Sequence, residues 1–134
     1  MKKIILISIS LILLVIMPLV FGCSQTIPPP ELTQQQKTFA IQTIMDYPEV
    51  RDADIIQEGK VLSLAIIVGY ATSEERARQL GDNFVRLVKT FGPDSSPGKI
   101  IGQGTYDYLI AVATPDQRII VQGAKVNSSD HITW

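Results

Sequence analysis

Residues 61–91 read VLSLAIIVGYATSEERARQLGDNFVRLVKTF, and their pattern changes from that of a strand to that of a helix. Over residues 61–70, apolar side chains alternate on one face and the other face is also largely apolar, which is typical of a strand in the interior of a sheet. From Thr72 the period changes to that of a helix. Thr72-Ser73-Glu74-Glu75 fits a capping box, and its two glutamates suit the positive end of a helix dipole. We therefore expect a central strand followed by an amphipathic helix that ends at Gly92-Pro93.

The expected helix has one apolar stripe and a charged outer side. Glu74 and Arg78, and Asp82 and Arg86, are spaced four residues apart, which favours ion pairs on the solvent side. The stripe that should face the sheet consists of Ala77, Leu80, Phe84, Leu87, Val88 and Phe91.

Before this stretch, the sequence predicts another helix and a first strand. Thr33-Gln34-Gln35-Gln36 fits a capping box, and a helix from there should end at Tyr47-Pro48. Residues 50–57 form the expected strand, and the turn Glu58-Gly59-Lys60 joins it to residues 61–70 as a hairpin, because glycine can supply a positive φ.

After it, the sequence predicts a loop and a second hairpin. Residues 92–104 are rich in glycine and proline, and residues 105–113 and 118–126 alternate as strands around the turn Thr114-Pro115-Asp116-Gln117. The tail, residues 127–134, shows no period. The expected fold is α+β, with two helices packed on one face of a four-stranded antiparallel sheet in the order α-β-β-α-β-β.

The first 23 residues resemble the signal sequence of prokaryotic lipoproteins. Lys2 and Lys3 precede an apolar run that closes on Val20-Phe21-Gly22-Cys23, a lipobox in which Phe21 is bulkier than the family prefers. The resemblance implies cleavage before Cys23, the only cysteine, and its modification with diacylglycerol. An uncleaved transmembrane anchor and ordinary secretion stay open as alternatives, because the run is nearly long enough to span a bilayer.

The lipoprotein interpretation predicts a signal peptide (1–22), a lipidated Cys23 with a proline-rich linker (23–32) and one domain (33–134). Without Lys2 and Lys3, the 12 basic residues fall to 10 against 13 acidic ones, a net charge of −3. That balance argues against nucleic acid as a partner. The short linker with three consecutive prolines indicates a stiff tether and a site of action near the membrane.

No residue pattern in the domain predicts catalysis, a cofactor or a metal. Residues 92–99 fail as a phosphate-binding loop, because five residues separate the glycines and Ile100 follows the lysine. His131 is the only histidine, and the sequence has no Gly-x-Ser-x-Gly motif that would supply the nucleophilic serine of a hydrolase. The carboxylates Asp46, Glu49, Asp52, Asp54 and Glu58 lack the spacing of a calcium loop and are expected to form a solvated rim.

Tyr106 and Tyr108 are the candidate partner surface. They share one face of the strand at residues 105–113, where they either back the core beneath the helices or form an aromatic patch on the open face.

Residues 46–80 resemble the BON domain and similar small modules of secreted bacterial lipoproteins. The resemblance rests on Val50, on Ala53-Asp54-Ile55, on Gly59-Lys60-Val61-Leu62-Ser63-Leu64, and on Ser73-Glu74-Glu75-Arg76-Ala77 leading to Leu80. It implies a non-enzymatic envelope module associated with phospholipid or with other envelope proteins, and it transfers no functional residues. The second half of the chain, with an inserted loop and a complete hairpin, departs from the pattern.

The sequence thus predicts a lipid-anchored, extracytoplasmic and non-catalytic binding or structural module of the cell envelope. It would contact another envelope protein through the open sheet face or the edge of the fourth strand. The alternative is a carrier of a small molecule or lipid, with a pocket between sheet and helices that the loop at residues 93–104 closes.

Overall fold

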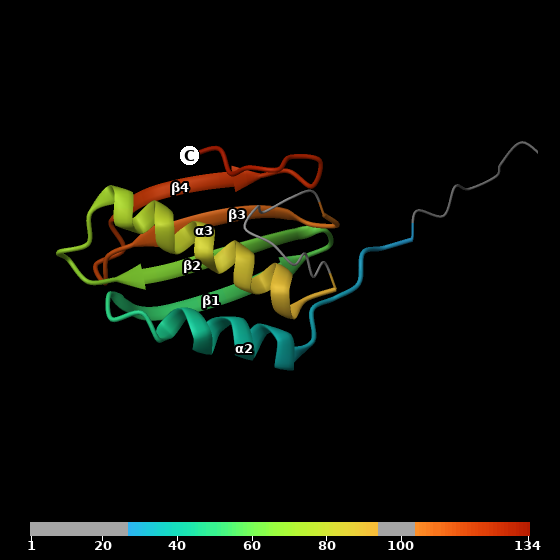
Figure 1. Cartoon of the computed structure of the whole chain (residues 1–134), viewed down its shortest axis with the longest axis horizontal. Coiled ribbons are helices and arrows are strands. Elements are labelled where there is room, and N and C mark those ends of the chain that lie inside the picture. The colour runs from blue at the N-terminus through green and yellow to red at the C-terminus, as the bar shows by residue number, and fades with distance from the viewer. Residues whose placement is uncertain (1–26, 94–103) are drawn as a thin grey trace, which may run out of the picture.

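Strand β2 (Val61–Val68) lies in the interior of a four-stranded sheet, and helix α3 (Glu74–Phe91) packs across one face of that sheet (Figure 1). The computed structural model describes residues 27–93 and 104–134. The expected signal peptide, Cys23 and most of the glycine-rich loop therefore lie outside the described residues.

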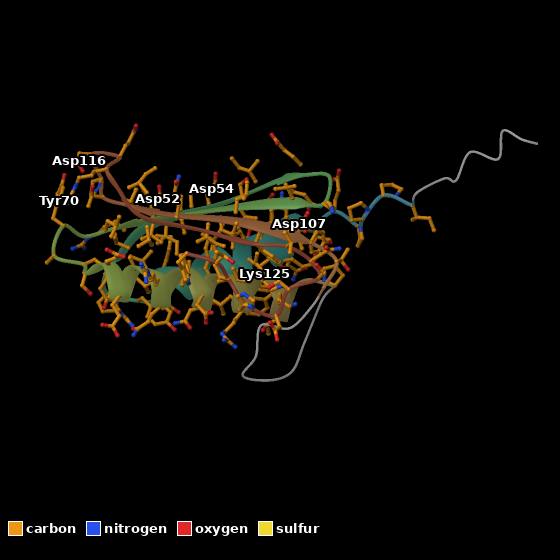
Figure 2. All side chains as sticks on the ribbon, turned by 90° about the horizontal axis from the view of Figure 1, so that it is seen from above. Asp52, Asp54, Tyr70, Asp107, Asp116 and Lys125 are labelled. Carbon is orange, nitrogen blue, oxygen red and sulfur yellow. The ribbon has the colours of Figure 1, made fainter. Side chains whose placement is uncertain are left out.

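The remaining elements follow the predicted order. They are α2 (Gln34–Met45), β1 (Val50–Glu58), β3 (Asp107–Ala113) and β4 (Ile119–Lys125), and the strands lie in the spatial order β1-β2-β3-β4. Seen along its edge, the sheet has both helices on one side (Figure 2). The prediction of two helices on one face of a four-stranded sheet is confirmed.

The direction of the central pairing was predicted wrongly. β1 and β2 pair antiparallel, as do β3 and β4, but β2 and β3 run parallel, so the sheet is mixed. The cause is the connection between them. α3 has 18 residues, which at about 1.5 Å per residue return the chain to the end where β2 began. A strand that follows such a crossover and lies beside β2 has to run parallel to it.

Local side-chain chemistry sets the ends of both helices. Thr33 Oγ1 accepts from the amide of Gln36, and the side chain of Gln36 accepts from the amide of Thr33, which confirms the capping box of α2. For α3 the N-cap is Ser73, whose Oγ accepts from the amide of Arg76 at 3.2 Å, one residue later than the predicted Thr72. The β1–β2 turn uses Gly59 at φ 60°, as expected.

The core fills the layer between the sheet and the helices. Its side chains come from alternate strand positions and from the apolar stripes of the helices. The most deeply buried members include Leu62, Leu64, Ile66, Val68, Ile110 and Val112 from the strands, and Leu80, Phe84, Val85 and Ile44 from the helices. The predicted ion pairs Glu74–Arg78 and Asp82–Arg86 are present on the outer side of α3.

The tail after β4 folds back against the sheet, which its aperiodic sequence does not predict. Thr133 pairs with Ala124 of β4 through two backbone hydrogen bonds of 2.9 and 2.8 Å. Next to it, the indole of Trp134 lies against two glycines, Gly81 of α3 and Gly123 of β4. A Cβ at these positions would lie 2.5 and 2.6 Å from the ring, so the absence of a side chain at both glycines makes the space for it.

Replacing Gly81 by alanine is expected to displace this indole. Trp134 is the only tryptophan, so the emission maximum of the protein should shift to longer wavelength as the ring enters water. The free energy of unfolding should change less than the steric clash alone would suggest, because alanine favours a helix over glycine by about 1 kcal/mol. Gly69→Ala is the control, since the nearest atom to its Cβ would be 3.7 Å away. An unshifted emission maximum in Gly81→Ala would contradict the docked position of Trp134.

Candidate functional site

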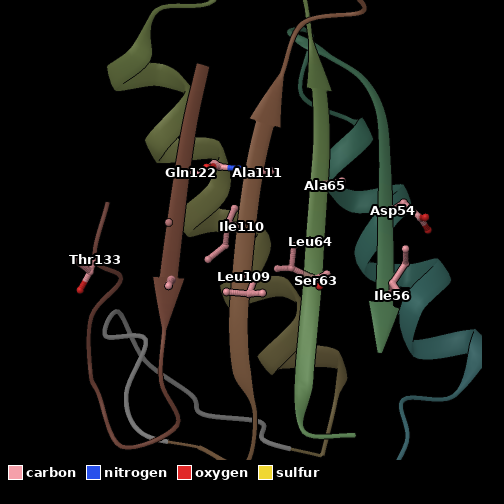
Figure 3. A pocket seen from close by; sticks show the side chains of 12 residues that line it. Asp54, Ile56, Ser63, Leu64, Ala65, Leu109, Ile110, Ala111, Gln122 and Thr133 are labelled. Carbon is pink, nitrogen blue, oxygen red and sulfur yellow. The ribbon is translucent and has the colours of Figure 1, made fainter. Parts of the chain in front are cut away.

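A hollow lies on the open face of the sheet, opposite the helices (Figure 3). It has a volume of about 530 Å³ and is built from two neighbouring rows of residues that run across all four strands. The first row is Ile56, Ser63, Leu109 and Ala124, with Thr133 beyond it. The second is Asp54, Ala65, Ala111 and Gln122.

Side-chain size explains the shape of this hollow. Ala65 and Ala111 are direct neighbours in the register and form a low floor at the centre. Ile56 and Leu109 rise beside them and are 55% and 51% exposed, although both are large and apolar. Exposed apolar residues that are contiguous, rather than scattered, mark interaction surfaces. The hollow is open to solvent, so it is shaped for a surface contact more than for an enclosed ligand.

One border of the open face is acidic. Asp52 and Asp54 of β1 project from the face that the helices leave free (Figure 2). Glu58 shares their side of β1 by strand alternation. The only basic residues within the four strands are Arg51 and Lys125. Lys125 is buried on the helix side, and the guanidinium of Arg51 lies beside Gly69 at the end of the sheet. Neither one balances the acidic border.

The two sheet edges are partly occupied by the chain itself. On β1, Asp52 Oδ1 accepts from the amide of Ala53 at 2.9 Å and Asp54 Oδ1 accepts from the amide of Ile55 at 2.8 Å. These amides are thereby satisfied without a neighbouring strand. On β4, Thr133 occupies the edge at Ala124. The edge of the fourth strand, one of the two predicted contact sites, is therefore less accessible than the open face.

Of the two roles expected for Tyr106 and Tyr108, the structure shows the one in the core and not the partner surface, because each side chain is 1% exposed. The hydroxyl of Tyr106 donates to the carbonyl oxygen of Pro30, and the ring of Tyr108 lies 5.9 Å from the ammonium of Lys125. Their strand face is the one that the helices cover, so these side chains are not available to a partner. The residues that replace them, Ile56 and Leu109, belong to the opposite strand face, and only the register of the sheet shows that they lie in one row, on either side of Ser63.

The segment before α2 is clamped to one end of the sheet. The amide of Leu32 donates to Gln57 Oε1 at 2.8 Å, and Gln57 Nε2 donates to the carbonyl of Pro30 at 3.2 Å. Leu32 itself is buried. Together with the bond from Tyr106, these contacts hold the end of the expected linker where β1 ends and β2 and β3 begin.

A second polar cluster lies at the start of α3. Arg76 Nε is 2.8 Å from Glu49 Oε1, and its guanidinium carbon is 5.5 Å from the centre of the Tyr47 ring. The hydrogen bond from Arg76 lowers the pKa of Glu49, and the same bond raises the pKa of Arg76. The ion pair joins α3 to the loop just before β1. Because the two charges neutralise each other, this cluster offers no unpaired charge to a ligand.

The acidic residues predicted as a solvated rim do not come together as a metal site. Within residues 27–93 and 104–134, no group of three or more potential metal ligands is found. His131 is exposed, with Nδ1 at 2.9 Å from Asp130 Oδ1 and 3.3 Å from Ser129 Oγ. A serine hydrolase uses the two ring nitrogens separately for its serine and its aspartate. Both contacts here fall on one nitrogen, so this turn has no relay geometry.

The predicted carrier pocket between sheet and helices stays a prediction. Buried side chains occupy that layer wherever the structure describes it. The loop that was expected to close over the pocket falls largely on residues 94–103, outside the described part of the chain.

The chain was compared with protein-family models, with curated proteins and with solved structures, and none of them matches it. Neither described helix is both long and apolar enough to cross a bilayer. The lipoprotein signal and the resemblance to BON domains therefore remain predictions from the sequence.

Asp107 is expected to make the stability of the fold depend on pH. The amide of Asn127 donates to its Oδ1 at 2.7 Å and the ammonium of Lys60 lies 3.1 Å from Oδ2, and both hold the pKa of Asp107 below its ordinary value. Because the pKa is lower in the folded state, the carboxylate stabilises the fold fully above the unfolded pKa of about 3.9. That contribution disappears as the pH falls through the folded pKa.

Asp107→Asn keeps the oxygen that accepts from Asn127 but removes the charge. The difference in free energy of unfolding between wild type and Asp107→Asn should be largest near neutral pH and should shrink below about pH 4, as followed by urea denaturation at each pH. Glu31→Gln, which removes an exposed carboxylate before α2, is the control. A difference that stays constant down to pH 2.5 would refute this role of Asp107.

Proposed function

We propose that this chain is a membrane-anchored, extracytoplasmic lipoprotein whose domain binds another envelope protein through its open sheet face, without catalysing a reaction. The observation that carries the binding role is the hollow on that face, with Ile56 and Leu109 more than half exposed above a floor of alanines. The helices cover the other face, and the chain occupies parts of both edges. The open face is thus the surface of the sheet that the described residues leave uncovered, and it carries exposed apolar side chains.

The size and form of the hollow favour a protein surface over a small ligand. Its volume falls within the range of small-molecule sites, which is roughly 300–1,000 Å³. Such sites enclose most of their ligand, however, whereas this hollow lies on the face of the sheet and is open to solvent. A macromolecular partner can cover such a face and exclude water from Leu109 and Ile56.

The anchor is supported by the sequence around Cys23 and by the clamp at Pro30. Pro30 is seven positions after Cys23, which gives a reach of at most about 25 Å when the chain is fully extended. Since Pro30 is fixed to the domain by Tyr106 and Gln57, an acyl chain on Cys23 would keep the domain close to the bilayer. A partner within this reach would be membrane-bound or membrane-adjacent.

The anchor is tested by the intact mass of the protein extracted from membranes. The expected mass corresponds to a chain that begins at Cys23 and carries at least diacylglycerol. Cys23→Ser should remove the lipid and release the protein from the membrane fraction. An intact mass that includes residues 1–22 with an unmodified thiol would overturn the anchor and leave the binding face untouched.

The binding role is tested by photo-crosslinking from the open face. The full-length chain carries benzoylphenylalanine in place of Leu109 and is expressed in the cells that produce it natively. A matched chain carries the same group in place of Gln35, which is exposed on α2. Crosslinks to a protein should form from position 109 and be absent or weak from position 35. Equal yields from both positions, or none from position 109, would refute the open face as the binding surface.

A further inference from the structure

The open face combines an apolar centre with charge of one sign. Its strand positions include the carboxylates Asp52, Asp54 and Glu58 along β1, and Asp107 on β3, which is paired with Lys60. No basic residue occupies a strand position on this face, since Arg51 and Lys125 lie elsewhere. A partner that covers the hollow therefore meets apolar side chains in the middle and unbalanced negative charge on the β1 side.

The carboxylates of this border can still accept hydrogen bonds from a partner. In Asp52 and in Asp54, Oδ1 accepts a hydrogen bond from the next backbone amide. A carboxylate has about four acceptor positions, so one bond to an amide leaves room for a cationic donor. Burying such a group under a neutral or acidic partner would cost free energy, whereas a lysine or arginine would offset that cost.

We infer that the occupant of this face is a basic amphipathic helix of another envelope protein, with apolar residues on Leu109, Ile56 and Ala111 and basic residues opposite Asp52 and Asp54. This inference rests on the proposed function. It adds the chemical class of the partner.

A helix suits this surface better than an added strand. Strand addition needs free backbone groups at an edge, and here carboxylates satisfy two amides of β1 while Thr133 occupies β4. A sheet face offers side chains only. The apolar stripe of a helix matches such a face, in the same way that α3 covers the opposite one.

Charge also disfavours two other occupants. A second copy of this chain would bring no basic strand residue of its own to the acidic border. An anionic bilayer would carry the same sign of charge as that border, so its surface would repel the open face. Both remain distinguishable outcomes in the experiment.

The test extends the crosslinking from position 109 in the full-length chain. The captured segment is located by mass spectrometry of the crosslinked peptide, and it should carry apolar residues at helical spacing with lysine or arginine beside them. Asp52→Asn together with Asp54→Asn should lower the crosslink yield about two- to tenfold, as expected for two exposed charge pairs. Asparagine keeps the oxygen that accepts from Ala53 or Ile55, so the fold should persist, and circular dichroism checks this.

Asp46→Asn together with Glu75→Gln is the matched control. It removes an equal number of negative charges from two exposed positions, one just after α2 and one in the first turn of α3, and the yield should not change. Raising the salt concentration from 50 to 500 mM during crosslinking in isolated membranes should lower the wild-type yield in the same way.

Every other outcome refutes either the basic helix or the proposed function. A captured segment that is neutral or acidic, a lipid adduct, a second copy of this chain, or an unchanged yield in the Asp52 and Asp54 variant would refute the basic helix. If a protein were still captured from position 109 in that case, the proposed function would survive. Absence of any adduct specific to position 109 would refute the proposed function itself.

Discussion

The parallel pairing of β2 with β3 determines which side chains lie on each face of the sheet. It places Leu64 beside Ile110 and Ile66 beside Val112 on one face, and this continuous apolar surface receives α3. The same register places Ala65 beside Ala111 and Ser63 beside Leu109 on the other face. A shift by one residue would exchange the two faces. The core and the hollow are therefore two results of a single alignment.

Much of the fold could be predicted from local sequence, because the signals for individual elements are local. The cap at Thr33, the glycine turn at Gly59 and the stop at Gly92-Pro93 lie within a few residues of the ends they define. The direction of β3 is different, since it depends on which strand becomes its neighbour. The alternation of side chains in residues 105–113 is the same for a strand that runs in either direction. The sequence therefore could not distinguish the mixed sheet from the antiparallel one that was predicted.

The candidate site could not be predicted for a related reason. Leu109 and Ile56 are 53 positions apart in the chain, and neither belongs to a motif. Tyr106 and Tyr108 are candidates for a partner surface because tyrosines are common at interfaces, but large aromatic side chains are equally suited to the core. Which strand face is covered follows from where the helices pack. Once that is known, the strand positions that alternate with the buried ones define the accessible surface, whether or not their residues are aromatic.

The clamp between Pro30 and Tyr106 also sets the end of the domain from which the expected linker leaves. The chain enters where β1 ends and β2 and β3 begin, so the strand axes point toward the attachment side (Figure 1). For an anchor at Cys23, the bilayer would be attached at this end of the strands and not at the open face. With this attachment, the open face would stay accessible to other membrane proteins that diffuse within the same leaflet.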